Sequence, residues 1–432
     1  MPAGKLQKLA IIGGGPGGLA SARVFLANCP SIEHIDLFVN DDNIGGVWYV
    51  PERSDVNKER SMYEYLETNL PKELMQFSDF PFKDEVNKFP KKQDVFNYLQ
   101  DYYAHFIKDN KKISIHWNAE VVNVSKTGDS WTITADIENH IDQFVNQYDH
   151  IISATGHFNR PFIPNDVKGL GAWFENGAAI HSKDFNNSEF TRGKTVVIVG
   201  NGSSGQDLVN QVSSVAKHVY HSISDTTQRS PIYIDDPIIS TVPQIVNTNW
   251  DTRTVQLANG VMLKDVDILI YATGYLYDVS FFDKEVRQDI VGDVSGIGKS
   301  MMNLFSHIFW NKDPTLAFSL VPLGIVPFPT AELQAALIVK VFSGKLDISN
   351  MKDTEYSQSV QFGAGVDVEY YRSLQNFIDD ANVGGVDPFQ PVKWCEPHKD
   401  LRLQCPDLKQ QRNVHLHNLA TKFRAQNQSY RI

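Results

Sequence analysis

A glycine-rich turn between a predicted strand and a predicted helix constrains the start of this chain more than any other feature. The turn occupies residues 13–18 (GGGPGG), after the apolar run 8–12 and before a helical segment that we place at 19–26. In the pattern G-x-G-x-x-G the first glycine permits a tight turn, the second lets a pyrophosphate approach the backbone, and the third lets helix and strand pack closely. The helix N-terminus then faces the phosphate charge. The sequence therefore predicts a dinucleotide-binding unit.

The same pattern occurs a second time further along the chain. Residues 195–199 (TVVIV) predict a buried strand, residues 200–205 (GNGSSG) a turn, and residues 206–216 a helix. Each unit is also followed by an acid, a short strand and Ala-Thr-Gly, at residues 149–156 and 267–274. This internal repeat favours two nucleotide-binding folds of related construction.

The order of these motifs predicts how the chain is divided. The segment 160–193 is rich in turn residues and marks a crossing between domains. After Gly274 no third glycine turn begins, so we expect the chain to return to the first domain. We predict an α/β protein with two dinucleotide-binding Rossmann-like domains, the second inserted into the first. The expected bounds are 1–187 for the first part of the first domain, 188–278 for the inserted domain and 279–432 for the return segment.

Composition excludes several classes of protein. The 432 residues include 40 Lys and Arg against 51 Asp and Glu, and the net charge of −11 argues against broad binding to nucleic acid or an anionic membrane. No apolar run reaches the roughly 18 residues that a membrane-spanning helix needs. The 13 His are scattered, so we predict no metal site.

The number and spacing of the cysteines limit the redox reactions that the sequence can support. Cys29, Cys395 and Cys405 are odd in number and form no C-x-x-C pair, so they predict neither a disulfide framework nor a redox dithiol. Flavoprotein disulfide reductases also carry two dinucleotide units, but they relay electrons through paired cysteines beside the flavin. What remains is a flavin that takes hydride from a nicotinamide nucleotide and delivers it to oxygen or another soluble acceptor.

The ends of two strands bear on the choice of nucleotide. The strand 35–39 ends in Val39 and Asn40, where an acid for the ribose hydroxyls is typical, and Asn40, Asp41 or Asp42 could accept that hydrogen bond. The strand 219–222 of the second unit also lacks a carboxylate at its end, and an acid there would repel a 2′-phosphate. NADPH is therefore favoured over NADH in the second unit. Its 2′-phosphate could be tolerated or bound by Lys217, His218, His221, Ser222 or Arg229.

Further short motifs follow one another through nearly the whole chain. They are residues 43–48 (NIGGVW), 66–69 (LETN), 74–82 (LMQFSDFPF), 156–157 (GH), 181–185 (HSKDF), 272–275 (ATGY), 313–318 (DPTLAF) and 332–335 (ELQA). In this order they resemble the flavin-containing monooxygenases, class B flavoproteins that bind FAD and NADPH, and especially the compact yeast members that include thiol oxidisers. The resemblance implies FAD in the first domain and NADPH in the inserted one.

The sequence departs from the family pattern at a few positions. In the fingerprint F-x-G-x-x-x-H-x-x-x-Y/F, Gly177, His181 and Phe185 keep their spacing, but Phe174 stands one residue too far upstream. Phe185 is followed by Asn, where Baeyer–Villiger relatives have Trp followed by Pro or Asp, and this disfavours ketone insertion. Ala336 stands where the family often has Arg, so no charged role is carried over to it.

The resemblance implies a catalytic role for Asn69. A side-chain amide can both donate and accept hydrogen bonds, and in this family it helps to hold the peroxide and the cofactor. The alternative is an Asn that caps a turn before Pro71. His157 and His181 are interpreted as structural, and Trp48 as a core residue or a wall of the flavin site. The predicted cofactor-binding residues are Gly13, Gly14, Gly15, Pro16, Gly17, Gly18, Asn40, Gly46, Val47, Trp48, Thr68, Asn69, Gly200, Gly202, Ser203, Ser204, Gly205, Gln206, Arg229, Thr273, Gly274 and Gln334.

The function implied is an FAD- and NADPH-dependent monooxygenase that uses O2, through a hydroperoxyflavin, to oxygenate soft sulfur or nitrogen in thiols, sulfides and amines. The alternatives are a Baeyer–Villiger activity, an uncoupled NADPH oxidase and, as a distant third, a non-catalytic FAD-binding protein. We expect a small-molecule nucleophile and O2 as partners, no nucleic acid, no transmembrane segment and a cytoplasmic location. The sequence leaves open a homodimer, peripheral association with the cytosolic face of the endoplasmic reticulum, and the identity of the substrate.

Overall fold

The computed structural model describes residues 6–51, 61–228, 230–233, 235–353, 359–382 and 385–432. Within these residues the chain forms two compact units. Unit 1 comprises Met1–Tyr49, Leu70–His157 and Leu276–Cys405, and unit 2 comprises Val50–Asn69, Phe158–Tyr275 and Pro406–Ile432. The long middle segment of unit 2 therefore lies between two segments of unit 1 along the chain.

The bounds of the units differ from the predicted divisions at 187/188 and 278/279. The segments 50–69 and 406–432 fall in unit 2, and side chains of their described residues contact the helix that follows the second glycine turn. Tyr63 donates a hydrogen bond to Asp207, and Asn413 Nδ2 donates to Gln206 Oε1 at 2.8 Å. The assignment of one cofactor to each part of the chain stays a prediction.

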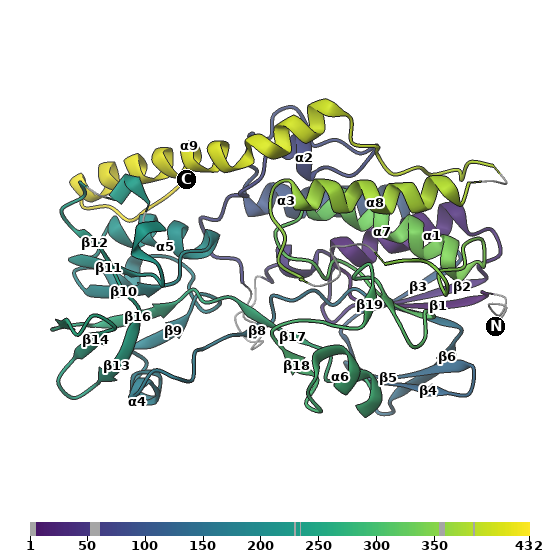
Figure 1. The fold of residues 1–432 in the computed structure, drawn as a ribbon, viewed down its shortest axis with the longest axis horizontal. Coiled ribbons are helices and arrows are strands. Elements are labelled where there is room, and N and C mark those ends of the chain that lie inside the picture. Colours follow the sequence, from purple (N-terminus) through teal and green to yellow (C-terminus); the bar gives the residue numbers. More distant parts are fainter. Residues whose placement is uncertain (1–5, 52–60, 229, 234, 354–358, 383–384) are drawn as a thin grey trace. The chain divides into compact units, whose positions relative to one another are not determined.

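Unit 1 is built on a seven-stranded sheet in the order β19-β20-β21-β7-β1-β2-β3 (Figure 1). Five strands pair in parallel, namely β1 (Lys8–Ile12), β2 (His34–Phe38), β3 (Ile113–His116), β7 (His150–Ser153) and β21 (Leu316–Phe318). Two short strands complete one side of the sheet by antiparallel pairing, β20 (Phe309–Trp310) with β21 and β19 (Leu304–Phe305) with β20. The central strands are apolar along most of their length because both faces of the sheet are covered.

Helices cover one face of this sheet, and a second sheet packs on the other (Figure 1). The helices are α1 (Pro16–Asn28), α2 (Lys72–Met75), α3 (Lys92–Phe106), α7 (Pro327–Phe342) and α8 (Val366–Asp380). The antiparallel sheet consists of β4 (Ala119–Thr127), β5 (Ser130–Ile137) and β6 (Phe144–Tyr148). The elements β17 (Tyr275–Asp278), α6 (Lys284–Val291) and β18 (Ile297–Gly298) come later in the chain, and β17 pairs with β18 in a separate sheet. Trp131 of β5 is fully buried against the main sheet.

Unit 2 contains a smaller parallel sheet in the order β12-β11-β10-β16-β9. Its strands are β12 (Ile239–Val242), β11 (His218–Ser222), β10 (Thr195–Val199), β16 (Ile268–Tyr271) and β9 (Ala179–His181). The unit also contains β8 (Arg160–Pro161), α4 (Leu170–Glu175), α5 (Ser203–Ser213) and a small antiparallel sheet of β13 (Ile245–Asn249), β14 (Thr254–Leu257) and β15 (Met262–Leu263). The odd and even residues of β10 face two separate cores, which explains the continuous apolar run TVVIV.

Both predicted helices begin earlier than expected. The structure starts α1 at Pro16 rather than Leu19, and α5 at Ser203 rather than Gln206. Each helix therefore begins inside its glycine motif, because proline suits a first helical turn and serine suits a helix start. The prediction also placed the end of the second helix three residues too late, since α5 ends at Ser213 and the Val215 carbonyl already accepts a hydrogen bond from Gly193.

The C-terminal helix α9 (Glu396–Ala425) belongs to both units. Its residues up to Cys405 are part of unit 1, and those from Pro406 onward are part of unit 2. Arg402 Nε donates to Asp367 Oδ2 at 2.6 Å in unit 1, and Arg424 donates to Asp236 Oδ2 at 2.8 Å in unit 2. Each part of the helix is thus held by an ion pair of its own unit.

Candidate active site

The first glycine turn has the strict backbone geometry that its motif predicts. Gly13 has a φ of +115°, and its N–H donates to the Phe38 carbonyl at 2.8 Å. A Cβ at Gly13 would lie closer than 3.0 Å to the Ala154 carbonyl, and a Cβ at Gly18 would lie closer still to the Gly13 carbonyl. Both positions therefore require glycine, the first for its φ and the third for close packing of helix and strand.

The second glycine turn repeats this geometry contact by contact. Gly200 has a φ of +117° and donates to the Ser222 carbonyl at 2.9 Å. A Cβ at Gly200 would lie closer than 3.0 Å to the Ala272 carbonyl, and one at Gly205 would meet the Gly200 carbonyl. The two Ala-Thr-Gly segments therefore close the two turns in the same way.

The acids that begin the repeated closing segments have a structural explanation. Asp149 Oδ2 accepts the backbone N–H of Lys8 at 2.8 Å, and Asp267 Oδ2 accepts that of Thr195 at 2.8 Å. Each acid therefore accepts a hydrogen bond from the backbone N–H of the first residue of the strand that leads into its glycine turn. The repeat in the sequence thus reflects a repeated strand junction.

The middle glycines of the two turns differ in what lies beside them. A Cβ at Gly202 would have no atom within 4 Å, and one at Gly15 would meet only Gly46 Cα at 3.5 Å and Gly46 N at 3.9 Å. Both glycines are the N-cap residues of their helices with extended backbone, so it is space and not φ that favours glycine here. The first N–H groups of a helix have no partner within the helix, and this suits a pyrophosphate at either turn.

The segment that contains Gly46, Val47 and Trp48 lies over the first turn. Gly45 N–H donates to the Gly14 carbonyl at 2.9 Å, and a Cβ at Gly46 would lie 2.8 Å from Gly15 Cα. Val47 and Trp48 are partly buried, and Trp48 packs against the core of unit 1. The structure therefore brings this predicted motif to the first glycine turn.

Val39 stands where the ribose acid was expected, and the structure shows why. A Cβ at Gly14 would lie 2.8 Å from Val39 Cγ2, so the valine side chain fills the space beside the turn. Of the three alternatives, Asp41 is buried, and Asp42 Oδ1 accepts a hydrogen bond from the Tyr49 hydroxyl at 2.6 Å. Asn40 is exposed just after β2 and stays the predicted ribose ligand.

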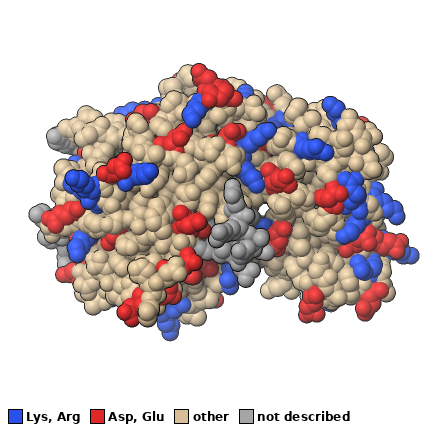
Figure 2. All heavy atoms as spheres, turned by 180° about the vertical axis from the view of Figure 1, so that it is seen from behind, with Lys and Arg blue, Asp and Glu red and all other residues tan. Residues whose placement is uncertain are grey.

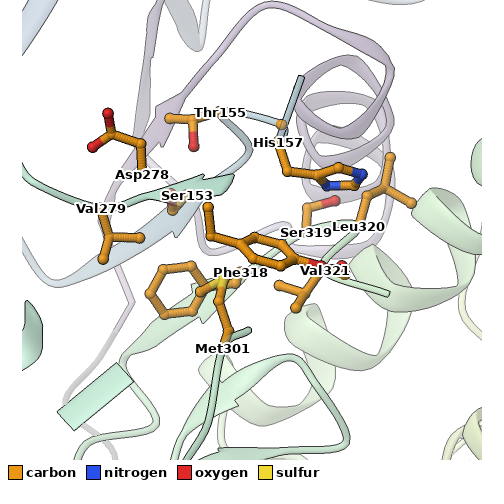
Figure 3. Close-up of a pocket in the computed structure, with 12 residues that line it drawn as sticks. Ser153, Thr155, His157, Asp278, Val279, Met301, Phe318, Ser319, Leu320 and Val321 are labelled. Carbon is orange, nitrogen blue, oxygen red and sulfur yellow. Dashed lines mark hydrogen bonds between the residues drawn. The ribbon is translucent and has the colours of Figure 1, made fainter. Parts of the chain in front are cut away.

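A pocket opens in unit 1 at the carboxyl ends of β7 and β21 (Figure 3). This edge of a parallel sheet is where ligands bind in open α/β folds. The His157 ring packs 5.4 Å from the Tyr277 ring, and burial lowers the pKa of His157 to about 4, so the imidazole is neutral at physiological pH. The lining residues are Ser153, Thr155, Gly156, His157, Tyr277, Asp278, Val279, Met301, Phe318, Ser319, Leu320 and Val321.

The pocket and the first glycine turn together fit a flavin nucleotide. Ser319 Oγ lines the pocket, is buried and has no hydrogen-bond partner among the residues that the structure describes. It also faces Gly17 of α1, because a Cβ there would lie 2.7 Å from this oxygen. An unsatisfied buried hydroxyl beside a helix N-terminus with open backbone space is the arrangement expected when a polar ligand is to be bound. Sequence reasoning missed Ser319, since a single serine carries no motif.

The structure places Asn69 at the second glycine turn. Asn69 is exposed, and its Nδ2 donates to Ser203 Oγ at 3.0 Å, while Thr68 beside it is buried. Lys409 Nζ of α9 donates to the same Ser203 Oγ at 3.0 Å. The residue predicted to be catalytic therefore lies at the helix start that is expected to hold the nicotinamide nucleotide.

Two glutamines predicted to bind a cofactor are held by the protein instead. Gln334 is fully buried in α7, its Oε1 accepts from Leu320 N at 2.8 Å and its Nε2 donates to Tyr370 at 2.9 Å. Its side chain thus supports the pocket segment, and its role as a cofactor contact stays a prediction. Gln206 Nε2 donates to the Asn201 carbonyl at 3.1 Å, and its Oε1 accepts from Asn413, so it supports the second turn.

Thr273 and Gly274 follow β16 at the second turn. The Thr273 hydroxyl donates to the Phe162 carbonyl, and the Gly274 carbonyl accepts from Phe162 N at 2.9 Å. Gly274 has a φ of +84°, and a Cβ there would have no atom within 4 Å, so the backbone here borders open space. Ser204, in the first turn of α5, is exposed.

Two of the candidates for a 2′-phosphate are unsuitable. His221 is fully buried, its Nε2 lies 2.9 Å from the Gly200 carbonyl, and burial lowers its pKa. The Ser222 hydroxyl is buried and donates to the Pro243 carbonyl at 3.0 Å. Both residues therefore support the turn from inside the protein. Arg229 lies outside the described residues.

His181 of unit 2 resembles His157 in its environment. It is buried, its Nδ1 accepts from Lys183 N at 3.1 Å, and its ring meets the Tyr275 ring at 5.0 Å. Burial lowers its pKa to about 4. Neither histidine is therefore a cation at neutral pH.

Other features of the described residues bear on the class of protein. Cys29 and Cys405 are buried, Cys395 is exposed, and all three are free thiols. Across the described ranges no group of three metal-ligating side chains is found, and no helix there is long and apolar enough to cross a membrane. Acidic and basic side chains are interspersed on the face shown in Figure 2.

Comparison with known proteins identifies the class. The sequence family described as flavin-binding monooxygenase-like matches residues 6–233 and 238–360. The chain is 42% identical over 412 residues to the thiol-specific monooxygenase of Saccharomyces cerevisiae, a match that covers 94% of this chain and 93% of the relative. It is 28% identical over 367 residues to the trimethylamine monooxygenase of Pelagibacter ubique, covering 81% of this chain and 78% of the relative.

Solved structures agree in fold. The S-allyl-L-cysteine S-oxygenase of Allium sativum matches with a TM-score of 0.76 at 22% identity, over 99% of this chain and 100% of the other. The chain therefore belongs to the family of flavin-binding monooxygenases. It is a flavin monooxygenase with the α/β fold of that family, an enzyme class that oxygenates soft nucleophiles.

Proposed function

We propose that this enzyme binds FAD at the first glycine turn and NADPH at the second, and oxygenates thiols with O2. The observation that carries the proposal is the pair of glycine turns, which repeat one phosphate-binding geometry in two units. Each turn leads into a helix N-terminus, whose first backbone N–H groups have no partner within the helix. Thiols are proposed as substrates because the relative at 42% identity is a thiol-specific monooxygenase.

In unit 1 the chain offers several groups to FAD. Backbone N–H groups of the first turn would hold the pyrophosphate, Asn40 would reach the ribose, and Ser319 Oγ would donate to a polar atom near the pocket. The backbone of Gly45 and Gly46 lies against this turn at Gly14 and Gly15. Bound FAD would supply the redox chemistry that accepts hydride and activates O2.

In unit 2 the second turn would hold NADPH. Ser203, Ser204 and the backbone from Gly202 lie at the start of α5, where the pyrophosphate charge is favoured. The strand β11 ends in Ser222, where an acid would repel a 2′-phosphate. Asp225, three residues further on, accepts hydrogen bonds from the Thr227 hydroxyl at 2.6 Å and from Gln228 Nε2 at 3.2 Å. Asn69 would hold the reacting groups by hydrogen bonds from its amide.

The reaction requires no strong general acid or base from the protein. A thiol, O2, NADPH and one proton give a sulfenic acid, NADP⁺ and water, and a second thiol then converts the sulfenic acid to a disulfide with release of water. The neutral His157 adds no charge to the pocket, and the mixed lining of Met301, Phe318 and Ser319 excludes bulk water while offering a hydroxyl.

The test follows NADPH, oxygen and product together in the purified protein. We expect a yellow protein whose flavin is bleached by NADPH under anaerobic conditions, and whose NADPH consumption in air is matched by loss of thiol from glutathione or dithiothreitol. Methyl phenyl sulfide and trimethylamine serve as further soft nucleophiles, and cyclohexanone as the ketone control. NADPH consumption that yields hardly any oxygenated product from any of these nucleophiles would contradict the proposal.

The same assay separates the alternatives. Hydrogen peroxide formed in proportion to NADPH would indicate an uncoupled oxidase, and lactone formed from cyclohexanone would indicate Baeyer–Villiger activity. A protein that is colourless, or yellow but not bleached by NADPH, would indicate a non-catalytic flavin-binding protein. A homodimer and peripheral association with the endoplasmic reticulum stay predictions for size-exclusion chromatography and membrane fractionation.

A further inference from the structure

Lys409 is a cation of α9 that forms no ion pair with a carboxylate of the described residues. Its side chain is half-buried, and its Nζ donates to Ser203 Oγ at 3.0 Å. Within the described part of the chain no Asp or Glu forms an ion pair with it, whereas Arg402 and Arg424 on the same helix each have one. The nearest acid, Asp207, is hydrogen-bonded to Tyr63, and the hydrogen bond of the half-buried ammonium goes to a neutral hydroxyl. The ammonium thus loses hydration without forming an ion pair, and this arrangement favours binding of an anion.

The hydrogen bonds of Ser203 point to the same ligand chemistry. A serine hydroxyl has two acceptor lone pairs and one donor hydrogen. Asn69 Nδ2 and Lys409 Nζ both donate to this oxygen at 3.0 Å, so both lone pairs are used. The hydroxyl hydrogen is left to donate outward, and no acceptor for it is found among the described residues. Ser203 is therefore arranged to donate to an anionic oxygen.

The backbone around Ser203 provides the space for that anion. Ser203 is the first residue of α5, and its neighbour Gly202 has no atom within 4 Å of the place where a Cβ would stand. The first N–H groups of an α-helix have no partner within the helix and carry the positive end of its dipole. A phosphate here would meet backbone N–H groups, a hydroxyl and an ammonium at once.

The position of Lys409 is fixed by its neighbours on α9. Asn413 Nδ2 donates to Gln206 Oε1 at 2.8 Å, and Arg412 pairs with Glu67 at 3.4 Å. Burial, and then the nearby Arg412, lower the pKa of Lys409. The acid that faces this region is Asp207, which is buried, hydrogen-bonded to Tyr63, and has its own pKa raised by burial.

We propose that Lys409 binds the pyrophosphate of the nicotinamide dinucleotide at the start of α5, together with Ser203. The proposal rests on the proposed binding of NADPH at this turn. It adds a phosphate-binding residue that lies beyond the segment matched by the family, which ends at residue 360. The pyrophosphate is favoured over the 2′-phosphate because it sits at the helix N-terminus of such turns, whereas the ribose lies at the end of the second strand, which here is β11.

The decisive experiment compares two nucleotides on the full-length, FAD-loaded enzyme. NADP⁺ and NAD⁺ share the pyrophosphate, but only NADP⁺ has a 2′-phosphate. We expect Lys409→Gln to raise the Kd of both, by the same factor of about tenfold to a hundredfold, because one charge-assisted hydrogen bond is lost. Calorimetric titration measures both constants. We also expect the Kd of the variant to depend less steeply on salt than that of the unaltered enzyme.

Two further variants serve as controls for charge and for position on the helix. Lys409→Arg retains the charge and should restore most of the affinity, and Lys422→Gln removes an exposed lysine of the same helix and should leave both Kd values unchanged. Unchanged Kd values in Lys409→Gln would overturn the proposal and leave Lys409 as a clasp between α9 and α5. A loss confined to NADP⁺ would also overturn it, because it would place Lys409 at the 2′-phosphate.

The failure of this proposal is distinguishable from that of the proposed function. The unaltered enzyme is first tested for bleaching by NADPH in the absence of oxygen and for binding of NADP⁺. If neither occurs, the proposed function fails. If both occur and Lys409→Gln binds both nucleotides as the unaltered enzyme does, only the role of Lys409 fails.

Discussion

The two glycine turns share a backbone but differ in what surrounds them. Gly13 and Gly200 have φ values of +115° and +117°, and each is closed by an Ala-Thr-Gly segment. The first turn is covered by the backbone of the segment that contains Gly46, whereas the second is open at Gly202 and carries polar side chains on Ser203. The first turn therefore offers a phosphate mainly backbone N–H groups. The second turn adds the charge of Lys409, so its affinity for a phosphate should depend on salt and on mutation of that residue.

The largest effect is expected from the third glycine of each turn. A Cβ at Gly18 or Gly205 would overlap the carbonyl of the first glycine, so Gly18→Ala or Gly205→Ala must displace backbone. We expect Gly18→Ala to yield protein without flavin. Gly205→Ala should stay yellow but bind NADP⁺ more than about a hundredfold less tightly. Absorbance of bound flavin and calorimetry measure the two effects, and loss of flavin from Gly205→Ala would show that the two turns are not independent.

A variant at Asn69 tests the role of the polar side chains that distinguish the second turn from the first. Asn69→Ala removes the amide that donates to Ser203, so the groups it would hold lose a fixed hydrogen bond. We expect normal flavin content and continued NADPH consumption, with product per NADPH reduced about tenfold or more. The ratio of thiol oxidised to NADPH consumed is the measurement. An equal ratio in the variant and the unaltered enzyme would contradict the role.

The middle glycines allow binding to be changed without unfolding the protein. A Cβ at Gly15 would meet atoms no closer than 3.5 Å, and one at Gly202 would meet none within 4 Å. Gly15→Ala and Gly202→Ala should therefore leave the thermal stability of the ligand-free protein nearly unchanged. We expect about tenfold weaker binding of FAD in the first variant and of NADP⁺ in the second, because the phosphate must move away from the backbone. A lowered melting temperature without a change in Kd would mean that these spaces hold no ligand.

The smallest effect concerns a histidine that only the second turn contains. His221 holds the Gly200 carbonyl, whereas Leu37 occupies the matching register of β2. Burial lowers the pKa of His221 below that of an unfolded histidine, so its contribution to stability is present above about pH 6.5 and declines as the pH falls. We expect His221→Leu to lose about 1 kcal/mol at pH 7.5 and less at pH 5.5. Chemical denaturation at the two pH values measures this, and an equal loss at both would rule out titration of His221.

The backbone of the site could be predicted from the sequence, because glycine motifs encode conformation directly. The strand runs 8–12 and 195–199 correspond to β1 and β10, and the Ala-Thr-Gly repeat corresponds to the closure of the two turns. The contacts of Asn69 with Ser203, and of Lys409 with the same residue, join positions far apart in the chain. No local pattern indicates them, since they depend on how distant segments pack.

Side-chain roles were also hard to predict where packing decides them. Gln334 and His221 lie in sequence motifs that suggest ligand binding, but both are buried, with both amide atoms of Gln334 and Nε2 of His221 bonded to the protein. Ser319 carries no motif and yet lines the pocket with an unsatisfied hydroxyl. Residue type and spacing indicate which groups are present, whereas burial decides which of them can meet a ligand.

The division of α9 at Pro406 has a consequence for how the chain senses its nucleotide. Residues after that point lie against the second turn, and Lys409 and Asn413 reach Ser203 and Gln206 from there. By thermodynamic reciprocity, a nucleotide that binds more tightly when this helical segment is seated must in turn hold the segment in place. Amide hydrogen exchange in residues 406–425 should therefore slow when NADP⁺ is added. The order of the C-terminal helix would then depend on whether a nucleotide occupies the second glycine turn, although the sequence of the helix contains no nucleotide-binding motif.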